Sequence, residues 1–487
     1  MSLTDHFYRF REHIIGQSHD YSESSHNSNI LYADWTASGR LYRPIEDFIS
    51  HELGPYVANT HTETTLTGTT MTEAYHDAQR IIKQHVNAYD SDVLIAAGSG
   101  MTLVINKFQR MLGLRVPEKW RERLQIAEHE KPLVLVTHME HHSNQTTWHE
   151  CEVTLEIVRS TDEGRPDLQH MRDLLEHYKD RPVKIGSFTA CSNVTGITTP
   201  YHEMAEIMHQ YDGLCFIDFA ASAPYVDIDM HPANPEQRLD AIFLSPHKFL
   251  GGPGSSGILI FDDKLYDCKV PDQPGGGTVS WTNPWGEHRF FDNIEAREDG
   301  GTPAFLQTIK AALSIKLKDA MQVDKIQARE EELVKILLQG LRQHPDIRIL
   351  EDQQDDRLCI VSFYVLGIHH NLLVRLLNDR FGIQSRGGCS CAGTYGHLLL
   401  GVDQLQSHEI TNRIDQGDLT DKPGWVRVSL HPTNTDQEAH FLVDSILKVI
   451  ENAEAWSKDY DFDQSSGEFR PKNTGKTLKS LADFNPL

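Results

Sequence analysis

The sequence predicts an α/β protein that has a large, mostly parallel sheet of seven strands and a smaller α+β unit toward its C-terminus. Between Val93 and Phe261, short β-branched runs end in Gly, Ser, Asn or Asp, and helical stretches follow several of them. Strands that alternate with helices are typical of a parallel sheet covered on both faces. The chain has 487 residues, enough for a sizeable core and equal to about three units of ~150 residues.

The first elements are a short helix and a loop, expected within the polar residues 1–30, where Ser22–Ser28 is rich in Ser, His and Asn. Strands of the large sheet are predicted at Val93–Ala97, Leu133–Thr137, Val153–Val158, Val183–Thr189, Leu214–Asp218, Ala241–Ser245 and Gly257–Phe261. Amphipathic stretches between them, such as Asp167–Tyr178 and Tyr201–Tyr211, predict helices. Pro271–Glu287 is rich in Gly, Pro and Trp and is expected to be a long functional loop.

Helical periodicity from Pro303 to Leu341 predicts two helices, the second long and charged. The smaller unit is then predicted to have strands at Ile347–Leu350, Leu358–Tyr364 and Trp425–Leu430, with helices at His370–Phe381 and Thr435–Ala453. The polar tail Trp456–Leu487 is expected to be an extended arm or disordered. We expect an N-terminal segment (1–30) that packs with the small domain, a large domain (31–320), a small domain (321–455) and a tail (456–487).

The charge balance disfavours two classes of partner. Lys and Arg total 46 and Asp and Glu total 70, so the formal net charge is −24. Such a chain repels phosphate backbones and anionic lipid surfaces, so neither nucleic acid nor a membrane is an expected partner. No stretch approaches the ~18 consecutive apolar residues of a membrane span. The polar residues 1–20 lack the apolar core of a signal peptide.

The cysteine count predicts a reducing compartment. Seven cysteines are an odd and sparse set, which does not suit a disulfide scaffold. We therefore expect a cytoplasmic enzyme in which a special cysteine is reactive rather than cross-linked.

A lysine and an aspartate lie where an α/β enzyme carries out its chemistry. Lys248 follows a predicted strand in the sequence SPHK and precedes the glycine-rich run GGPGSSG. Burial there lowers the pKa of a lysine amine and lets it form a Schiff base, although an isolated SxHK is also typical of a surface loop. Asp218 ends another strand, at the edge where ligands bind in open α/β sheets. A carboxylate there can pair with a pyridinium nitrogen or can cap a helix.

Three further segments follow strands of the same sheet. The turn Gly98–Thr102 opens a helix, so its N–H groups suit a phosphate, although it lacks the lysine of a Walker loop. His141, in the sequence EHHSN, can stack on a flat ring and relay protons. His138 and His149 are near by, so a metal site is an alternative. Asn193, in CSNVTG, can bond a ring substituent or form a turn.

The order of these elements, from the phosphate turn to Lys248, resembles the class V aminotransferase family of pyridoxal-phosphate enzymes, which share the fold-type I architecture. The likeness covers about Leu31 to Leu447. It implies that the large domain binds pyridoxal 5'-phosphate, that the substrate is an amino acid and that the protein is a homodimer. The cofactor-binding residues that it implies are Ser99, Gly100, His141, Asn193, Asp218, Ser245, His247, Lys248 and Thr302.

Within that family the chain is most similar to the cysteine desulfurase and selenocysteine lyase group. The segment RGGCSCA at residues 386–392 resembles the group's RxGxxCA segment, whose cysteine carries the persulfide, and this maps the catalytic thiol onto Cys391. The sequence WVRVSL resembles the strand whose arginine binds the substrate carboxylate, which implies Arg427 as a substrate ligand together with Asn193. Thr302, in GGTP, resembles a threonine that reaches the phosphate of the partner subunit.

The resemblance implies an enzyme that removes sulfur from L-cysteine, releases L-alanine and leaves a persulfide on Cys391 for a sulfur-acceptor protein. Lys248 would form the Schiff base and move the Cα proton, and His141 would stack on the ring and assist proton transfer. Arg386 is a candidate for stabilising the Cys391 thiolate.

The chain departs from the desulfurase pattern at three places. Ala221 stands where a glutamine that touches the cofactor is usual, and the phosphate turn lacks two usual threonines. Cys389 and Ser390 replace two histidines, so a second thiol lies two residues from Cys391, where it can resolve a persulfide, form a disulfide or be inert. The alternatives are another class V enzyme (aminotransferase, epimerase or β-lyase), a non-catalytic sulfur-relay or scaffold protein, and a His-rich metal protein.

Overall fold

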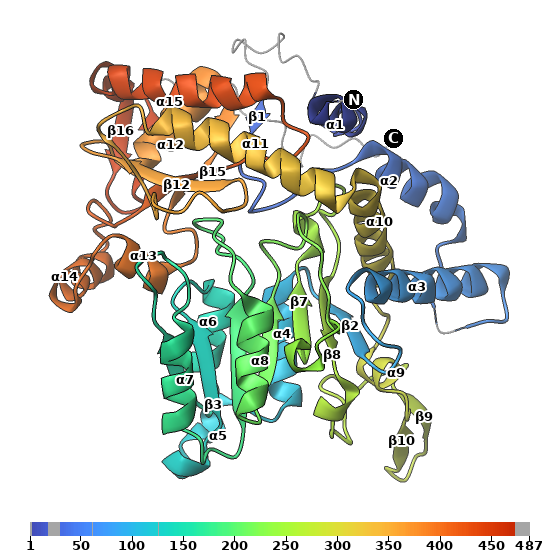
Figure 1. The fold of residues 1–487 in the computed structure, drawn as a ribbon. Coiled ribbons are helices and arrows are strands. Elements are labelled where there is room, and N and C mark those ends of the chain that lie inside the picture. Colours follow the sequence, from blue (N-terminus) through green and yellow to red (C-terminus); the bar gives the residue numbers. More distant parts are fainter. Residues whose placement is uncertain (1, 18–29, 61, 125, 473–487) are drawn as a thin grey trace.

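A seven-stranded sheet forms the larger part of the fold in this computed structural model, which describes residues 2–17, 30–60, 62–124 and 126–472 (Figure 1). Its strands are β2 (Val93–Ala97), β3 (Leu133–Thr137), β4 (Thr154–Val158), β5 (Lys184–Thr189), β6 (Leu214–Asp218), β7 (Ala241–Leu244) and β8 (Gly257–Phe261). The order is β2-β8-β7-β6-β5-β3-β4. Strand β8 runs opposite to the other six strands of this described sheet, so the predicted mostly parallel sheet is confirmed.

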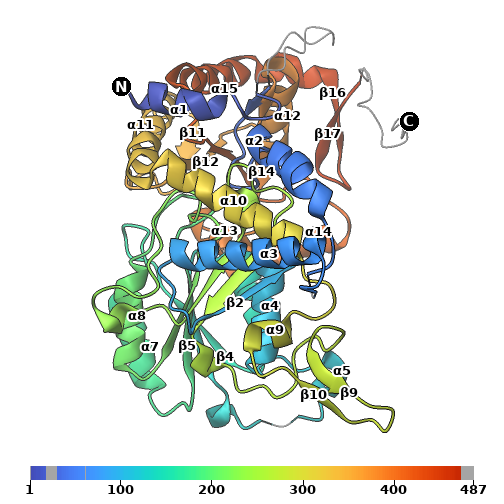
Figure 2. The same cartoon turned by 90° about the vertical axis from the view of Figure 1, so that its right-hand side faces the viewer.

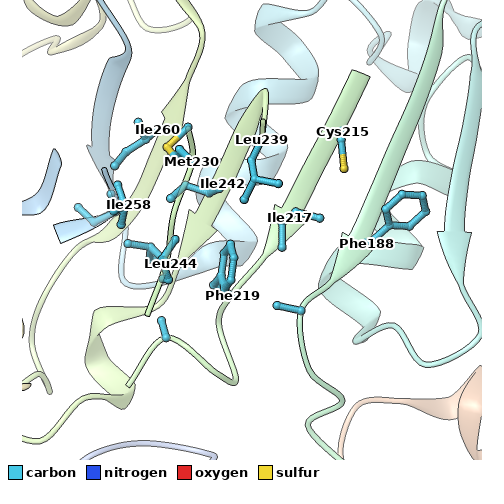
Figure 3. Packing of buried hydrophobic residues seen from close by; sticks show 14 of the residues in the cluster. Phe188, Cys215, Ile217, Phe219, Met230, Leu239, Ile242, Leu244, Ile258 and Ile260 are labelled. Carbon is cyan, nitrogen blue, oxygen red and sulfur yellow. The ribbon is translucent and has the colours of Figure 1, made fainter. Parts of the chain in front are cut away.

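Helices cover both faces of this sheet, because its buried strands present apolar side chains to each face in turn. They are α3 (Leu66–His85), α4 (Met101–Met111), α6 (His142–His149), α7 (Leu168–His177), α8 (Tyr201–Gln210) and α10 (Phe305–Met321). On one face, α3, α7, α8 and α10 pack around residues such as Ile217 and Ile242. Figure 3 shows these two side chains among the buried apolar residues of this face. On the other, α4 and α6 pack around Phe216 and Phe243. Figure 2 shows α3 and α10 lying side by side.

A four-stranded antiparallel sheet forms the smaller part of the fold, above the first sheet in Figure 1. In order, its strands are β11 (Ile347–Ile349), β12 (Ile360–Val365), β15 (Trp425–Ser429) and β14 (Arg386–Gly388). Three helices pack against it, namely α11 (Val323–Leu341), α12 (His370–Phe381) and α15 (Asp436–Trp456). The sequence did not predict β14, because its residues Arg-Gly-Gly have low β-propensity and strand pairing alone orders them.

The N-terminal residues reach the smaller part of the fold. Helix α1 (Leu3–Arg11) contacts α11, and Arg11 forms a bidentate ion pair with Glu438 of α15, both N–O distances being 2.8 Å. The two-residue strand β1 (Leu31–Tyr32) pairs in parallel with β13 (Ile383–Gln384). The Ser22–Ser28 patch lies outside the described residues.

A hairpin begins at Val279 within the segment Pro271–Glu287 and ends beyond it, so the predicted long loop is confined to residues 271–278 and the turn, and the prediction was wrong for the rest. Strand β9 (Val279–Thr282) pairs antiparallel with β10 (His288–Phe290). The Asn283 side chain accepts from the N–H groups of Trp285 and Glu287 at 3.1 Å each, which closes the turn. The Gly, Pro and Trp content that suggested a loop therefore belongs to the turn and its flanks.

The tail also contains a hairpin, of β16 (Tyr460–Asp463) and β17 (Glu468–Pro471). It is ordered by two aromatic rings, since Phe462 and Phe469 lie 4.8 Å apart and both contact the His369 ring. Residues 473–487 of the predicted tail lie outside the described residues. The α-helices not yet named are α2 (Arg43–Asp47), α5 (Glu118–Arg121), α9 (Ile294–Glu298), α13 (Gly393–Leu399) and α14 (Gln404–Asp415). Among the described residues, no helix combines the length and apolar character needed to cross a lipid bilayer.

Candidate functional site

A cavity of about 200 Å³ lies at the carboxyl ends of the parallel strands. Segments that follow β2, β3, β5, β6 and β7 form one side of it, and Arg386 of β14 and Arg427 of β15 close the other. Because parallel strands end at one edge of a sheet, residues far apart in the chain meet there. The predicted residues that line it are Gly100, His141, Asn193, Asp218, Ser245, His247, Lys248 and Arg427.

Three predicted residues do not line this cavity. Ser99, next to the lining residue Gly100, and Thr302 are both exposed and are not among the lining residues. Cys391 is also exposed and lines a second cavity of about 360 Å³. Arg386 and Ser390 line both cavities, so Cys391 lies beside the first cavity, next to a shared wall.

The turn between β2 and α4 forms a cup suited to an anion. Gly98 has a φ of +58°, which residues with a Cβ rarely adopt, and this turns the chain into α4. A Cβ on Gly100 would lie 3.3 Å from Ser245 Oγ and 3.5 Å from the His247 ring, so the glycine keeps this corner open. The Met101 N–H donates to Ser245 Oγ at 2.9 Å and fixes it at the helix N-terminus, where the helix dipole favours negative charge.

Burial sets the charge states of Lys248 and Asp218. Desolvation lowers the pKa of Lys248 to about 8, while Asp218 opposes the shift and Arg427 adds to it. Desolvation raises the pKa of Asp218 to about 6, although this carboxylate accepts a hydrogen bond from the Ala220 N–H at 2.8 Å. Near pH 7.5 the carboxylate is therefore mostly ionised while the amine has a substantial neutral fraction. The neutral form of a lysine amine is the one that attacks a carbonyl carbon.

The His141 ring is neutral, and its hydrogen bond identifies the tautomer. Desolvation, and next the charge of Lys248, lowers the pKa of His141 to about 3. The Ser143 N–H donates to His141 Nδ1 at 3.1 Å, so the single ring proton is on Nε2. His141 thereby caps α6. Its neighbour His142 holds the loop that contains Cys391, because the His142 N–H donates to the Cys391 carbonyl at 2.8 Å.

The other two histidines of the predicted metal alternative lie apart from this arrangement. His138 is buried edge-on against Tyr395, with ring centroids 5.4 Å apart. His149 is exposed at the last turn of α6. Within the described ranges, no group of three or more His, Cys, Asp or Glu side chains is placed to hold a metal ion.

The cavity fits the pyridoxal phosphate that the sequence resemblance implies. Asn193 Nδ2 donates to the Ser390 carbonyl at 2.8 Å, but its buried Oδ1 has no partner among the described residues. A buried acceptor without a partner costs free energy, so a donor on a ligand is expected there. The open corner at Gly100, the Lys248 amine and the Asp218 carboxylate match a phosphate, an aldehyde and a pyridine nitrogen.

Asp34 joins the two arginines of the cavity, and sequence reasoning missed it. Its Oδ1 accepts from Arg427 Nη2 at 2.7 Å and its Oδ2 from Arg386 Nε at 3.2 Å. Arg427 also donates to the Asn193 carbonyl at 2.9 Å, and its buried Nε has no partner among the described residues. The ion pair spans 393 residues of the chain, so no local motif signals it. The parallel bridge between Asp34 and Ser429, two residues from Arg427, brings the charges together.

Asp34→Asn should destabilise the protein by about 3 kcal/mol, because it leaves the 2% exposed Arg427 without its counter-ion. Urea unfolding of the cofactor-free protein measures this. Asp356→Asn is the matched control: Asp356 pairs with Arg165 but is 78% exposed, so its loss should cost less than about 1 kcal/mol. Equal midpoints for the two variants would contradict the expected role of Asp34.

The lowered pKa of Lys248 predicts the pH dependence of cofactor uptake. With a pKa of about 8, the neutral fraction of the amine rises about tenfold between pH 7 and 9 and then levels. The rate at which cofactor-free protein develops visible absorbance with pyridoxal phosphate should follow this curve. A rate that keeps rising tenfold per unit to pH 10 would show an ordinary lysine instead.

The sequence is similar to a known family and to named proteins. The family model described as Aminotransferase class-V matches residues 31–442. A probable cysteine desulfurase of Halobacterium salinarum is 26% identical over 437 residues, covering 88% of this chain and 93% of that protein. Probable cysteine desulfurase 2 of Mycobacterium leprae is 28% identical over 292 residues, covering 59% of this chain and just under two thirds (66%) of that protein.

Solved structures show the same fold. The cysteine desulfurase CsdA of Escherichia coli superposes with a TM-score of 0.71 at 20% identity, covering 91% of this chain and 98% of that one. The cysteine desulfurase of Thermococcus onnurineus gives a TM-score of 0.70, also at 20% identity, over 87% and 95% of the two chains. With the family match over most of its length, this chain belongs to the class-V aminotransferases, a family of pyridoxal-phosphate-dependent enzymes.

Proposed function

We propose that this protein is a cysteine desulfurase, which takes sulfur from L-cysteine, releases L-alanine and leaves a persulfide on Cys391. The observation that carries the proposal is one cavity that contains Lys248, Asp218 and Arg427, with a cysteine-bearing loop at its shared wall. Relatives named as cysteine desulfurases support it.

Groups from five strand ends would hold the cofactor. Gly100, Ser245 and His247 would bind its phosphate at the start of α4, Lys248 would hold its aldehyde end, and Asp218 would pair with its ring nitrogen. His141 would lie against its ring. Asn193 and Ser99 would be further cofactor-binding residues. Thr302 would reach the cofactor site of a partner subunit in a homodimer. When bound, pyridoxal phosphate supplies an electron-accepting ring for the charge that develops at the substrate Cα.

The substrate is positioned and activated by side chains of this chain. Arg427 binds its carboxylate through the Nε that has no partner among the described residues, while Asp34 keeps the guanidinium in place. The neutral amine of Lys248 takes the Cα proton. The Cys391 thiolate then attacks the substrate sulfur: the new S–S bond forms as the C–S bond breaks, and the C–S electron pair stays with the carbon skeleton, which leaves as alanine after protonation.

The finer organisation of the molecule is part of this proposal. The protein acts as a cytoplasmic homodimer and passes the sulfur of Cys391 to an acceptor protein. Residues 31–320 form the cofactor domain and 321–455 the small domain, while residues 1–30 pack with the latter and 456–487 form the tail. The contact between α1 and α11 supports the placement of the N-terminal segment.

An amino-acid screen with the purified, cofactor-loaded protein tests the proposed activity. L-cysteine should give equal amounts of alanine and sulfide in the presence of a dithiol reductant. L-selenocysteine, L-cystine and L-alanine serve as comparison substrates. Pyruvate in place of alanine would show a β-lyase, and transfer of the amino group to a keto acid would show an aminotransferase.

A second candidate is another reaction of the same family, such as a β-lyase, epimerase or aminotransferase. One observation favours it: Ala221 lines the cavity with its small side chain, where the desulfurase pattern has a glutamine that touches the cofactor. Such an enzyme would use Lys248, Asp218 and Arg427 in the same way but would not need Cys391.

A further inference from the structure

The second cavity contains two thiols, and the reaction proposed above uses only one of them. Cys389 and Cys391 both line this cavity of about 360 Å³, and Arg386, Lys422, His369 and His370 line it with them. Of these four, Arg386 and Lys422 carry positive charge, which beside a thiol stabilises the thiolate and, for the same reason, a persulfide anion. Burial lowers the pKa of His369 and His370, so both imidazoles are neutral near pH 7. The second cavity is therefore suited to sulfur chemistry outside the cofactor site.

The backbone folds the two cysteines into one tight turn. The Ala392 N–H donates to the Cys389 carbonyl at 3.0 Å, and the two central residues, Ser390 and Cys391, have φ values of +50° and +57°. Residues other than glycine rarely adopt such angles, and strain of this kind persists only where surrounding contacts hold it. One such contact is the His142 N–H, which donates to the Cys391 carbonyl at 2.8 Å. The two cysteines are two Cα–Cα steps apart in the chain, so their Cα atoms lie within about 7.6 Å of each other.

The two thiols differ in exposure and in what they face. Cys391 is exposed, and its neighbour Ser390 lines both cavities, so Cys391 lies next to the cofactor cavity. Cys389 is half-buried and packs against an apolar cluster that includes Tyr395 and Trp425. A sulfur atom carried by Cys391 is open to any reductant, whereas one carried by Cys389 is partly sheltered.

We propose that Cys389 is a second sulfur carrier, which takes the outer sulfur atom from the Cys391 persulfide. This inference rests on the proposed desulfurase activity. The Cys389 thiolate attacks the outer sulfur of Cys391–S–S⁻, a new S–S bond forms on Cys389, and the old S–S bond breaks and returns Cys391 as a thiolate. Atoms and electrons balance without an oxidant or reductant. Cys391 is then free for a second substrate while the first sulfur waits in the second cavity.

A single-turnover experiment locates the sulfur. Cofactor-loaded protein is mixed with one equivalent of L-cysteine without reductant, quenched with acid after seconds, alkylated and cleaved. Fragment masses then assign the extra sulfur to Cys389 or Cys391, and alanine is measured in the same sample. We expect most of the extra sulfur on Cys389 in the unaltered protein.

Cys389→Ser and Cys389→Ala should form the first alanine at an unchanged rate, hold the sulfur on Cys391 alone and lose it to cyanide several-fold faster. Cys268→Ser is the matched control: Cys268 is also half-buried but lies far along the chain, where its Sγ donates to the Met111 carbonyl at 3.1 Å, and the variant should behave like the unaltered protein.

The outcomes separate this inference from the proposed activity. Alanine formed with sulfur confined to Cys391 in the unaltered protein, and Cys389→Ser behaving identically, would overturn the second carrier alone. No alanine from L-cysteine would overturn the desulfurase proposal and the carrier with it.

Discussion

Lys248→Ala should lower the rate of alanine formation from L-cysteine by about 10³-fold or more. The variant loses both the amine that anchors the cofactor and the base that takes the Cα proton. Desolvation brings the pKa of this amine to about 8, so near neutral pH the cavity already contains a base that free lysine would not supply. The visible absorbance of the purified protein, followed together with alanine release, measures both losses.

Two controls test whether the loss of activity in Lys248→Ala is due to the missing amine. Lys264→Ala removes an ammonium that is 85% exposed beside Asp262, and this variant should keep full activity. Added ethylamine should restore part of the Lys248→Ala rate, because a small amine can enter the space that the lysine left. Retention of the absorbance with less than a tenfold loss of activity would show that Lys248 is not the cofactor lysine.

Cys391→Ala should reduce sulfide and alanine release from L-cysteine by at least about 100-fold while leaving the visible absorbance unchanged. The activity should fall without a change in absorbance because Cys391 lines the second cavity rather than the cofactor cavity, so its loss leaves the cofactor-binding groups intact. Stopped-flow absorbance with L-cysteine, in parallel with alanine assays, separates binding from sulfur removal. Cys268→Ala, which removes a thiol that lines neither cavity, is the control.

Unchanged product release by Cys391→Ala would instead favour the second candidate function, another reaction of the same family. A β-lyase expels the substrate sulfur as a leaving group and needs no thiol from the protein. Unchanged sulfide release with pyruvate as product would therefore assign that reaction, and the Cys391 loop would then have a structural role only.

The sheet and the cofactor side of the cavity could be predicted because their signals are local. Val93–Ala97 and Leu133–Thr137 are buried β-branched runs whose predicted bounds are those of β2 and β3. Asp218 and Lys248 each follow such a run, and the parallel order of the strands is enough to place them together.

Other features depend on contacts that no local pattern carries. Asp34 follows a two-residue strand, and only the folded chain shows that it neutralises Arg427 and Arg386. Thr302 lies exposed, so its predicted cofactor contact stays a prediction that depends on a partner subunit. Strand β14 and the tail hairpin are ordered by pairing and by ring contacts with residues such as His369, which a sequence window does not contain.

The ion pair between Asp34 and Arg427 also determines how late in translation the complete cavity can form. The two partners are 393 residues apart, so translation at about 5–20 residues per second separates them by on the order of 20 to 80 s. The phosphate cup matures earlier, once Ser245 has emerged to accept from Met101. A ribosome-bound chain that ends before β15 thus already contains the residues of the anion-binding half of the cavity but lacks Arg427, the proposed ligand of the substrate carboxylate. An anion can therefore have its binding groups in the nascent chain before the proposed amino-acid substrate has them.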